Sequence, residues 1–154
     1  MRSVLAAILL IGIVTACGPD APASPIGDPH PALAGTAWRL AAVAGQPTPE
    51  VPASSIQFDD GRLSGEGPCN QIGASVSYDR SSGAIHLGDV ISTKRACLGP
   101  AMARLEAAFI GALRGSTAAA FDGNGDLVLT GSGVDLRFVA IAPAIPAGPT
   151  PAAP

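Results

Sequence analysis

Short stretches of alternating apolar and polar residues occupy the middle of the chain, a pattern typical of β-strands with one buried face. In residues 36–43, the predicted inward face consists of Trp38, Leu40 and Ala42. Turn-forming residues, such as those at 59–61, recur about every eight to twelve positions and predict antiparallel strands joined by hairpins. Further strands are predicted at residues 55–58, from residue 62 onward, and at 74–78, 85–87, 90–93, 117–121, 127–130 and 134–140.

One segment has helical rather than strand periodicity. Its apolar residues lie three or four positions apart and form a single stripe made of Met102, Leu105, Phe109 and Leu113. Pro100 suits the first turn of a helix, Arg114 complements the negative end of the helix dipole, and Gly115 is a suitable terminator. The pattern therefore predicts an α+β domain in which one helix packs against an antiparallel sheet.

The first sixteen residues, 1–16, have the features of a secretory signal peptide. Arg2 gives a positive start, residues 4–14 form an apolar run, and Thr15 and Ala16 are small residues suited to cleavage. This run is too short for a helix that crosses a bilayer, which needs about 20 residues.

The residues that end this segment resemble the bacterial lipobox, an aliphatic residue and two small residues before a cysteine, here Val14-Thr15-Ala16-Cys17. The resemblance implies that lipid is attached to Cys17, which becomes the first residue of an exported, membrane-anchored protein. Because Gly18 rather than Asp follows, it further implies the outer membrane, facing the periplasm, in a Gram-negative cell, or the cytoplasmic membrane in a Gram-positive cell. The alternative is an ordinary cleaved signal with an incidental cysteine.

Composition divides the rest of the chain into three parts. Residues 17–34 are rich in proline and predict an extended tether that begins at the lipidated cysteine. Residues 35–140 hold the predicted strands and helix and form one domain of common size. Residues 141–154 are almost entirely Ala, Pro and Gly, which predicts a disordered tail.

Charge excludes one class of partner. The 154-residue chain has a net charge of −3, and its basic residues are scattered, with Lys94-Arg95 the only adjacent pair in the predicted domain. Because binding to nucleic acid needs a concentrated basic face, we expect no nucleic-acid partner.

With Cys17 assigned to lipid, two of the three cysteines remain, Cys69 and Cys97. In an exported domain they favour a disulfide, which would stabilise the fold by about 3–4 kcal/mol in the chain-entropy model. Two alternatives use His86, the only histidine of the domain: a zinc site with both cysteines, or a thiol nucleophile at Cys69. We expect neither a metal nor a cofactor.

Four segments in order resemble the META domain, also called the HslJ-like domain: Gly35-Thr36-Ala37-Trp38, Ser64 to Asn70 ending in Cys69-Asn70, Thr93-Lys94-Arg95-Ala96-Cys97, and the helix pattern from Glu106 through Phe109 to Leu113. The resemblance implies a curved antiparallel sheet of about seven to nine short strands with one packed helix. It supplies no catalytic residues, and it implies a role in envelope stress or drug tolerance.

Two classes of function follow from the sequence. The first is a non-enzymatic envelope protein that binds a partner protein or an apolar ligand in a cleft between sheet and helix. The residues that would line the cleft, or simply fill the core, are Trp38, Ile56, Phe58, Leu105, Phe109 and Phe138. The alternative is a thiol-dependent or hydrolytic envelope enzyme that uses Cys69 and His86.

Two polar features have mainly structural interpretations. The acidic segment 122–126 superficially resembles a calcium loop but has Gly133 where such a loop requires glutamate. Its aspartates, like those at 59–60, lie in predicted turns, where Asp is common for backbone reasons. We expect Asn70 to hydrogen-bond the backbone of the loop that holds Cys69.

Overall fold

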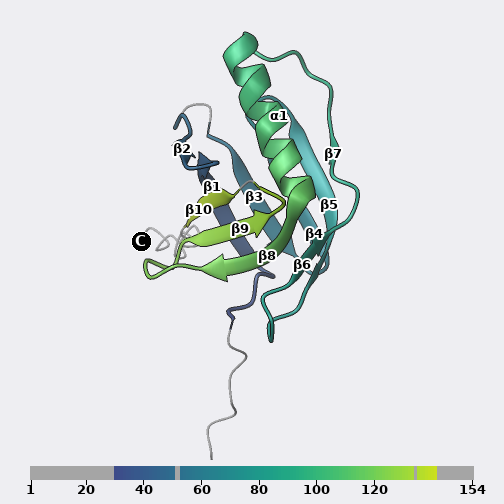
Figure 1. Ribbon diagram of the computed structural model, residues 1–154. Helices are drawn as coiled ribbons and strands as arrows, with labels where there is room; N and C mark the ends of the chain where they lie inside the picture. Colours follow the sequence, from purple (N-terminus) through teal and green to yellow (C-terminus); the bar gives the residue numbers. More distant parts are fainter. Residues whose placement is uncertain (1–29, 51–52, 134, 142–154) are drawn as a thin grey trace, which may run out of the picture.

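The computed structural model describes residues 30–50, 53–133 and 135–141, which form a strongly curved antiparallel sheet with one helix (Figure 1). The predicted signal peptide, Cys17, most of the predicted tether, Val134 and nearly all of the predicted tail lie outside the described residues. The elements are β1 (Thr36–Val43), β2 (Gln46–Pro47), β3 (Ser55–Asp59), β4 (Arg62–Glu66), β5 (Gln71–Tyr78), β6 (Ile85–Leu87), β7 (Ile91–Ser92), α1 (Pro100–Gly115), β8 (Ser116–Phe121), β9 (Leu127–Gly131) and β10 (Leu136–Ala140). The α+β prediction is confirmed.

The sheet nearly closes on itself. Its strand order is β6-β5-β4-β3-β1-β10-β9-β8, with β2 beside β1 and β7 beside β5. At the remaining seam, Ala84 pairs with Ala118, and the Ala119 N–H donates to the Gly83 carbonyl over 2.8 Å. Because closure removes unpaired strand edges, this seam protects the sheet from edge-to-edge association.

The predicted strands agree with the structure apart from the positions of some strand ends, the short strand β2 and the inward face of β1. Strand β5 begins at Gln71 rather than at residue 74, and the two-residue strand β2 was not predicted. The prediction that Ala42 faces inward is wrong: the register of β1 against β10 shifts between Leu40 and Ala42, and Val43 is buried instead. A bulge of one residue reverses the inward and outward faces beyond it, and alternation along one strand does not reveal it.

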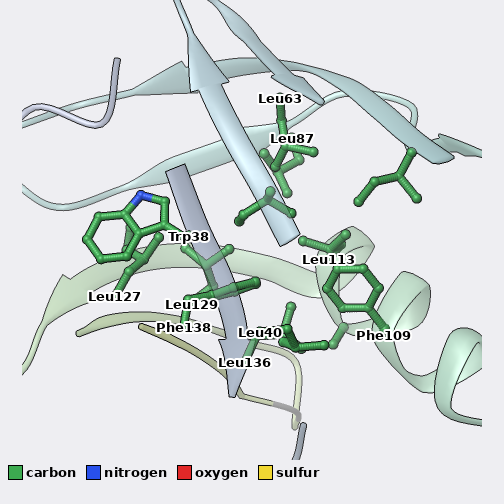
Figure 2. Close-up of a cluster of buried hydrophobic side chains, with 14 of the residues drawn as sticks. Trp38, Leu40, Leu63, Leu87, Phe109, Leu113, Leu127, Leu129, Leu136 and Phe138 are labelled. Atoms are coloured by element: carbon green, nitrogen blue, oxygen red, sulfur yellow. The ribbon is translucent and has the colours of Figure 1, made fainter. Parts of the chain in front are cut away.

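The core is filled by side chains from the inner face of the sheet and from α1 (Figure 2). The Phe109 ring of α1 lies 6.4 Å from that of Phe138 on β10, centroid to centroid. Five of the six candidate lining residues are at most 5% exposed, namely Trp38, Ile56, Phe58, Phe109 and Phe138. Leu105 is half-buried against the same cluster. All six therefore belong to the packed core or its margin.

Candidate functional site

The most unusual part of the described fold is the segment at residues 91–99, which runs along the edge of the sheet beside β5, from β7 to the start of α1 (Figure 1). We call this segment the strap. Only the backbone pairing of β7 with β5 gives it regular structure. Hydrogen bonds to Asn70 and the Cys69–Cys97 disulfide hold the strap to the rest of the domain, and Glu106 in turn holds Cys69. These four residues lie in the segments that resemble the META domain in sequence.

Asn70, at the start of β5, fixes the strap at two points. Its Oδ1 accepts hydrogen bonds from the Thr93 hydroxyl over 3.0 Å and from the Arg95 N–H over 2.6 Å. The Thr93 Oγ1 also accepts the Gln71 N–H over 3.1 Å. The expectation for Asn70 is corrected here: its side chain bonds the strap, 25 residues away, and only its main-chain carbonyl serves its own loop, by accepting the Gly67 N–H.

A disulfide fixes the far end of the strap. Cys69 and Cys97 are joined, with their Cα atoms 5.2 Å apart and a separation of 28 positions in sequence. The predicted disulfide is therefore present. Together with Asn70, it places covalent and polar restraints at the middle and the end of the strap.

Glu106 of α1 supports the disulfide end of these restraints through Cys69. Its side chain is only 8% exposed, and its Oε2 accepts the Cys69 N–H over 3.0 Å. Gly67 lies so close that an added Cβ would be 2.7 Å from the same oxygen, which explains the glycine. The other oxygen, Oε1, is buried and has no hydrogen-bond partner among the described residues.

Glu106 was not predicted to be part of this site, and the sequence marks it only as the first residue of the helix pattern. A signal was present, however, because Glu106 precedes Phe109 by three residues and so lies on the apolar stripe of α1, where a charged side chain requires a buried partner.

The outward surface of the strap is both basic and apolar. Leu98 is 90% exposed and Ile91 is 68% exposed, and they are two of the three large exposed apolar side chains of the described residues. Lys94 and Arg95 lie between them, are exposed, and form no ion pair with any described residue.

Two hollows flank this surface. One, of about 260 Å³, is lined by Gln71, Ile72, Gly73, Ile91, Ser92 and Thr93. The other, of about 240 Å³, is lined by Pro68, Cys69, Arg95, Ala96, Cys97, Leu98 and Met102. Both are small and open, so they suit single side chains or acyl segments better than a complete cofactor.

The structure does not bring His86 to the cysteines. His86 lies opposite Ser77 on β5, whereas Cys69 precedes the other end of that strand. Six residues of strand separate Ser77 from Gln71, which corresponds to about 20 Å. Because the Cys69 sulfur is also in a disulfide, the pair does not form the thiol and base of a nucleophilic site. Within the described ranges, no three His, Cys, Asp or Glu residues are placed to hold a metal ion.

The acidic loop at residues 122–126 is paired with an arginine side chain of the same domain. The Arg137 guanidinium forms ion pairs with Asp122 and, over 2.9 Å, with Asp126. The pKa of Asp122 is lowered, chiefly by the hydrogen bond from the Asn124 N–H. The Asp126 N–H and the charge of Arg137 lower the pKa further, while desolvation raises it in part. The loop is therefore a turn held by its own aspartate and arginine.

Comparisons with known proteins agree with this architecture. A family model described as META domain matches residues 31–143. The fold is similar to that of a Burkholderia xenovorans protein solved by NMR, with a TM-score of 0.58, 21% identity, and coverage of 72% of this chain and 85% of that one. A second NMR structure is similar at a TM-score of 0.57 and 20% identity, covering 69% and 89%.

At these identities the two structures support the fold alone. No curated protein matches the chain. Among the described residues, no helix has the length and apolarity needed to cross a membrane.

Proposed function

This chain belongs to the META-domain family, and we propose that it is a lipid-anchored, non-enzymatic envelope protein that binds a partner through the surface of its strap. The proposal is carried by one observation: the segments that resemble the family supply the residues that hold the strap in place. Asn70 and the Cys69–Cys97 disulfide hold the strap directly, and Glu106 holds Cys69. None of these residues offers a reactive group to solvent.

Surface binding is favoured over an apolar ligand held inside the domain. The residues that would line an internal cleft are packed against one another, with Phe109 and Phe138 fully buried. A ligand between sheet and helix would have to displace this core, at the cost of close-packed contacts. The strap, in contrast, presents apolar side chains that are already exposed.

The non-enzymatic part of the proposal rests on how the polar groups are used. Acid–base or nucleophilic chemistry needs groups within hydrogen-bond reach of one another and of a substrate. The Asn70 amide oxygen is occupied by the strap, and Glu106 is buried beneath Cys69. His86, the base of the alternative enzyme, lies at the opposite end of β5.

Lipid anchoring is proposed from the lipobox resemblance at Cys17. The Cys69–Cys97 disulfide supports export, because structural disulfides persist mainly in oxidising compartments. Replacement of Cys17 by Ser is the direct test. We expect Cys17→Ser to lose the mass of the attached acyl chains and to keep its signal segment uncut. An unchanged mass would contradict the anchor.

Partner binding can be tested without knowing the partner. We expect the backbone amides of residues 91–99 to exchange hydrogen more slowly in native envelope membranes than in detergent micelles, because a bound surface is shielded from water. Peptides from β9 and the acidic loop serve as the internal reference and should exchange equally in both. Equal exchange of the strap in membranes and micelles would contradict the proposed binding surface.

A further inference from the structure

Charge is distributed unevenly along this acidic chain. Residues 90–105 contain three cations, Lys94, Arg95 and Arg104, and no Asp or Glu, although the whole chain has a net charge of −3. All three side chains are exposed. The strap and the first turns of α1 therefore carry a local excess of positive charge on a chain that is net negative elsewhere. Two carboxylates flank this region: Asp89 borders a hollow with Ile91, and Glu66 accepts the Gln71 side-chain amide beside the strap.

The same end carries the most exposed apolar groups near these cations. Leu98 and Ile91 protrude, at 90% and 68% exposure, and Met102 is half-buried beside Leu98 at the rim of one hollow. The first turn of α1 has no acidic residue and no side-chain cap, so its partial positive charge adds to that of Lys94 and Arg95. Protruding apolar side chains among unpaired cations are typical of surfaces that bind anionic membranes.

We propose that the partner of the strap is the surface of an anionic lipid bilayer. Leu98 and Ile91 enter the interface between headgroups and acyl chains, while Lys94 and Arg95, with Arg104, bind lipid phosphates. This inference rests on the proposed function, because it names the partner of the same surface. A bilayer fits better than an acidic protein because Leu98 protrudes, at 90% exposure, from the rim of a hollow that is small and open. The anchor residues of protein interfaces instead pair with well-packed, desolvated pockets.

Rigidity and reach both favour this contact. The disulfide and the two bonds to Asn70 hold the apolar knobs in place before binding, so little conformational freedom remains to be lost. The thirteen residues from Cys17 to His30 can span at most about 45 Å, and α1 is about 24 Å long. The described chain begins at the end of the domain away from the start of α1, so the contact requires an extended tether (Figure 1). An anchor at Cys17 would keep the domain at a high effective concentration near the same bilayer.

Fluorescence quenching in defined vesicles tests the contact. The purified full-length lipoprotein carrying Leu98→Trp is reconstituted with brominated phosphatidylcholine, alone or with phosphatidylglycerol at about 30 mol%. We expect about two-fold quenching of the added tryptophan in the anionic vesicles and little in the neutral ones. The background of Trp38, which is only 5% exposed, is measured in the parent protein.

Matched variants show whether the quenching depends on the strap itself or only on the net charge of the protein and the exposure of the added tryptophan. Gln46→Trp places the reporter on exposed β2 and should not be quenched. Adding Lys94→Gln and Arg95→Gln to Leu98→Trp should abolish the quenching. Adding Gln46→Glu and Thr117→Glu, which change the net charge by the same two units at exposed sites elsewhere, should leave the quenching unchanged.

Vesicle flotation distinguishes failure of this inference from failure of the anchor. If the protein floats with the vesicles and Leu98→Trp is quenched no more than Gln46→Trp, the anchor stands and the bilayer contact is wrong. If a cross-linker at residue 98 captures an acidic envelope protein while the tryptophan remains unquenched, the partner is a protein and the bilayer contact is also wrong. If the protein does not float, lipid anchoring fails, and quenching by vesicles added to the soluble protein still decides the contact.

Discussion

The strap and the acidic loop at residues 122–126 both carry charged side chains, and they use these charges in opposite ways. In the acidic loop, Arg137 forms ion pairs with both Asp122 and Asp126, so the cation and its counter-ions belong to the same fold. In the strap, the polar groups that hold the segment are buried beneath it, whereas Lys94 and Arg95 have no counter-ion among the described residues. The matched charges of the acidic loop stabilise a turn, and the unmatched charges beside exposed apolar side chains of the strap are the basis of the proposed interface.

The largest effect should come from removing the disulfide. We expect Cys69→Ser with Cys97→Ser to lower the free energy of unfolding by about 3–4 kcal/mol, because the cross-link closes a long loop in the unfolded chain. Urea unfolding of the variant and of the parent, with and without reductant, measures this difference. Reductant should destabilise the parent and leave the variant unchanged. A loss below about 1 kcal/mol would mean that Asn70 and Glu106 alone hold the strap.

A pair of glycine substitutions compares the packing of the two regions. In Gly67→Ala, the new methyl group would lie 2.7 Å from Glu106 Oε2 and 3.1 Å from the Asn70 carbonyl oxygen, so we expect a loss of about 1–3 kcal/mol. In Gly123→Ala, no atom lies within 4 Å of the new group, and we expect a change within about 0.5 kcal/mol. Thermal unfolding of both variants checks the contrast. Equal losses would show that the region beneath the strap is no more tightly packed than the acidic loop.

How far the sequence determines these regions depends on whether the interactions are local. The strand at residues 36–43 and the helix stripe were predictable, because periodicity constrains them directly. The Cys69–Cys97 pair was predictable from the expectation of an exported domain, in which paired cysteines are favoured. The bulge after Leu40 was not, because it depends on how β1 aligns with β10, almost a hundred residues later.

The polar part of the candidate site was predictable only in pieces. The side-chain partners of Asn70 come from a segment more than twenty residues away, and no local pattern specifies that contact. Glu106 could have been found from its place on an apolar stripe, but its partner, the Cys69 N–H, is 37 residues distant in sequence. The exposure of Leu98 likewise follows from the path of the strap rather than from its own sequence.

A smaller effect should distinguish the role of Asn70 from that of the disulfide. Asn70→Ala removes the oxygen that accepts from Thr93 and Arg95, and we expect a loss of about 1–2 kcal/mol, because water can replace part of these bonds at the partly exposed strap. Hydrogen exchange at the Arg95 amide should accelerate at the same time. Asn70→Asp keeps an acceptor oxygen and should retain most of the protection. Unchanged exchange at Arg95 in Asn70→Ala would contradict the proposed restraint.

The smallest effect should come from the acidic loop, where the ion pair is the lesser of several interactions. The Asn124 N–H is the largest cause of the lowered pKa of Asp122, and the charge of Arg137 comes later. We therefore expect Arg137→Gln to raise the pKa of Asp122 only part of the way to its ordinary value, and two-dimensional NMR titration measures this. Because the pKa is lowered by folding, Asp122 stabilises the fold above its ordinary pKa of about 4, and this contribution is lost as the pH falls through the lower, folded value. The variant should consequently match the parent in strong acid and be slightly less stable at neutral pH. A full return of the Asp122 pKa to its ordinary value would show that Arg137, rather than the backbone, organises the loop.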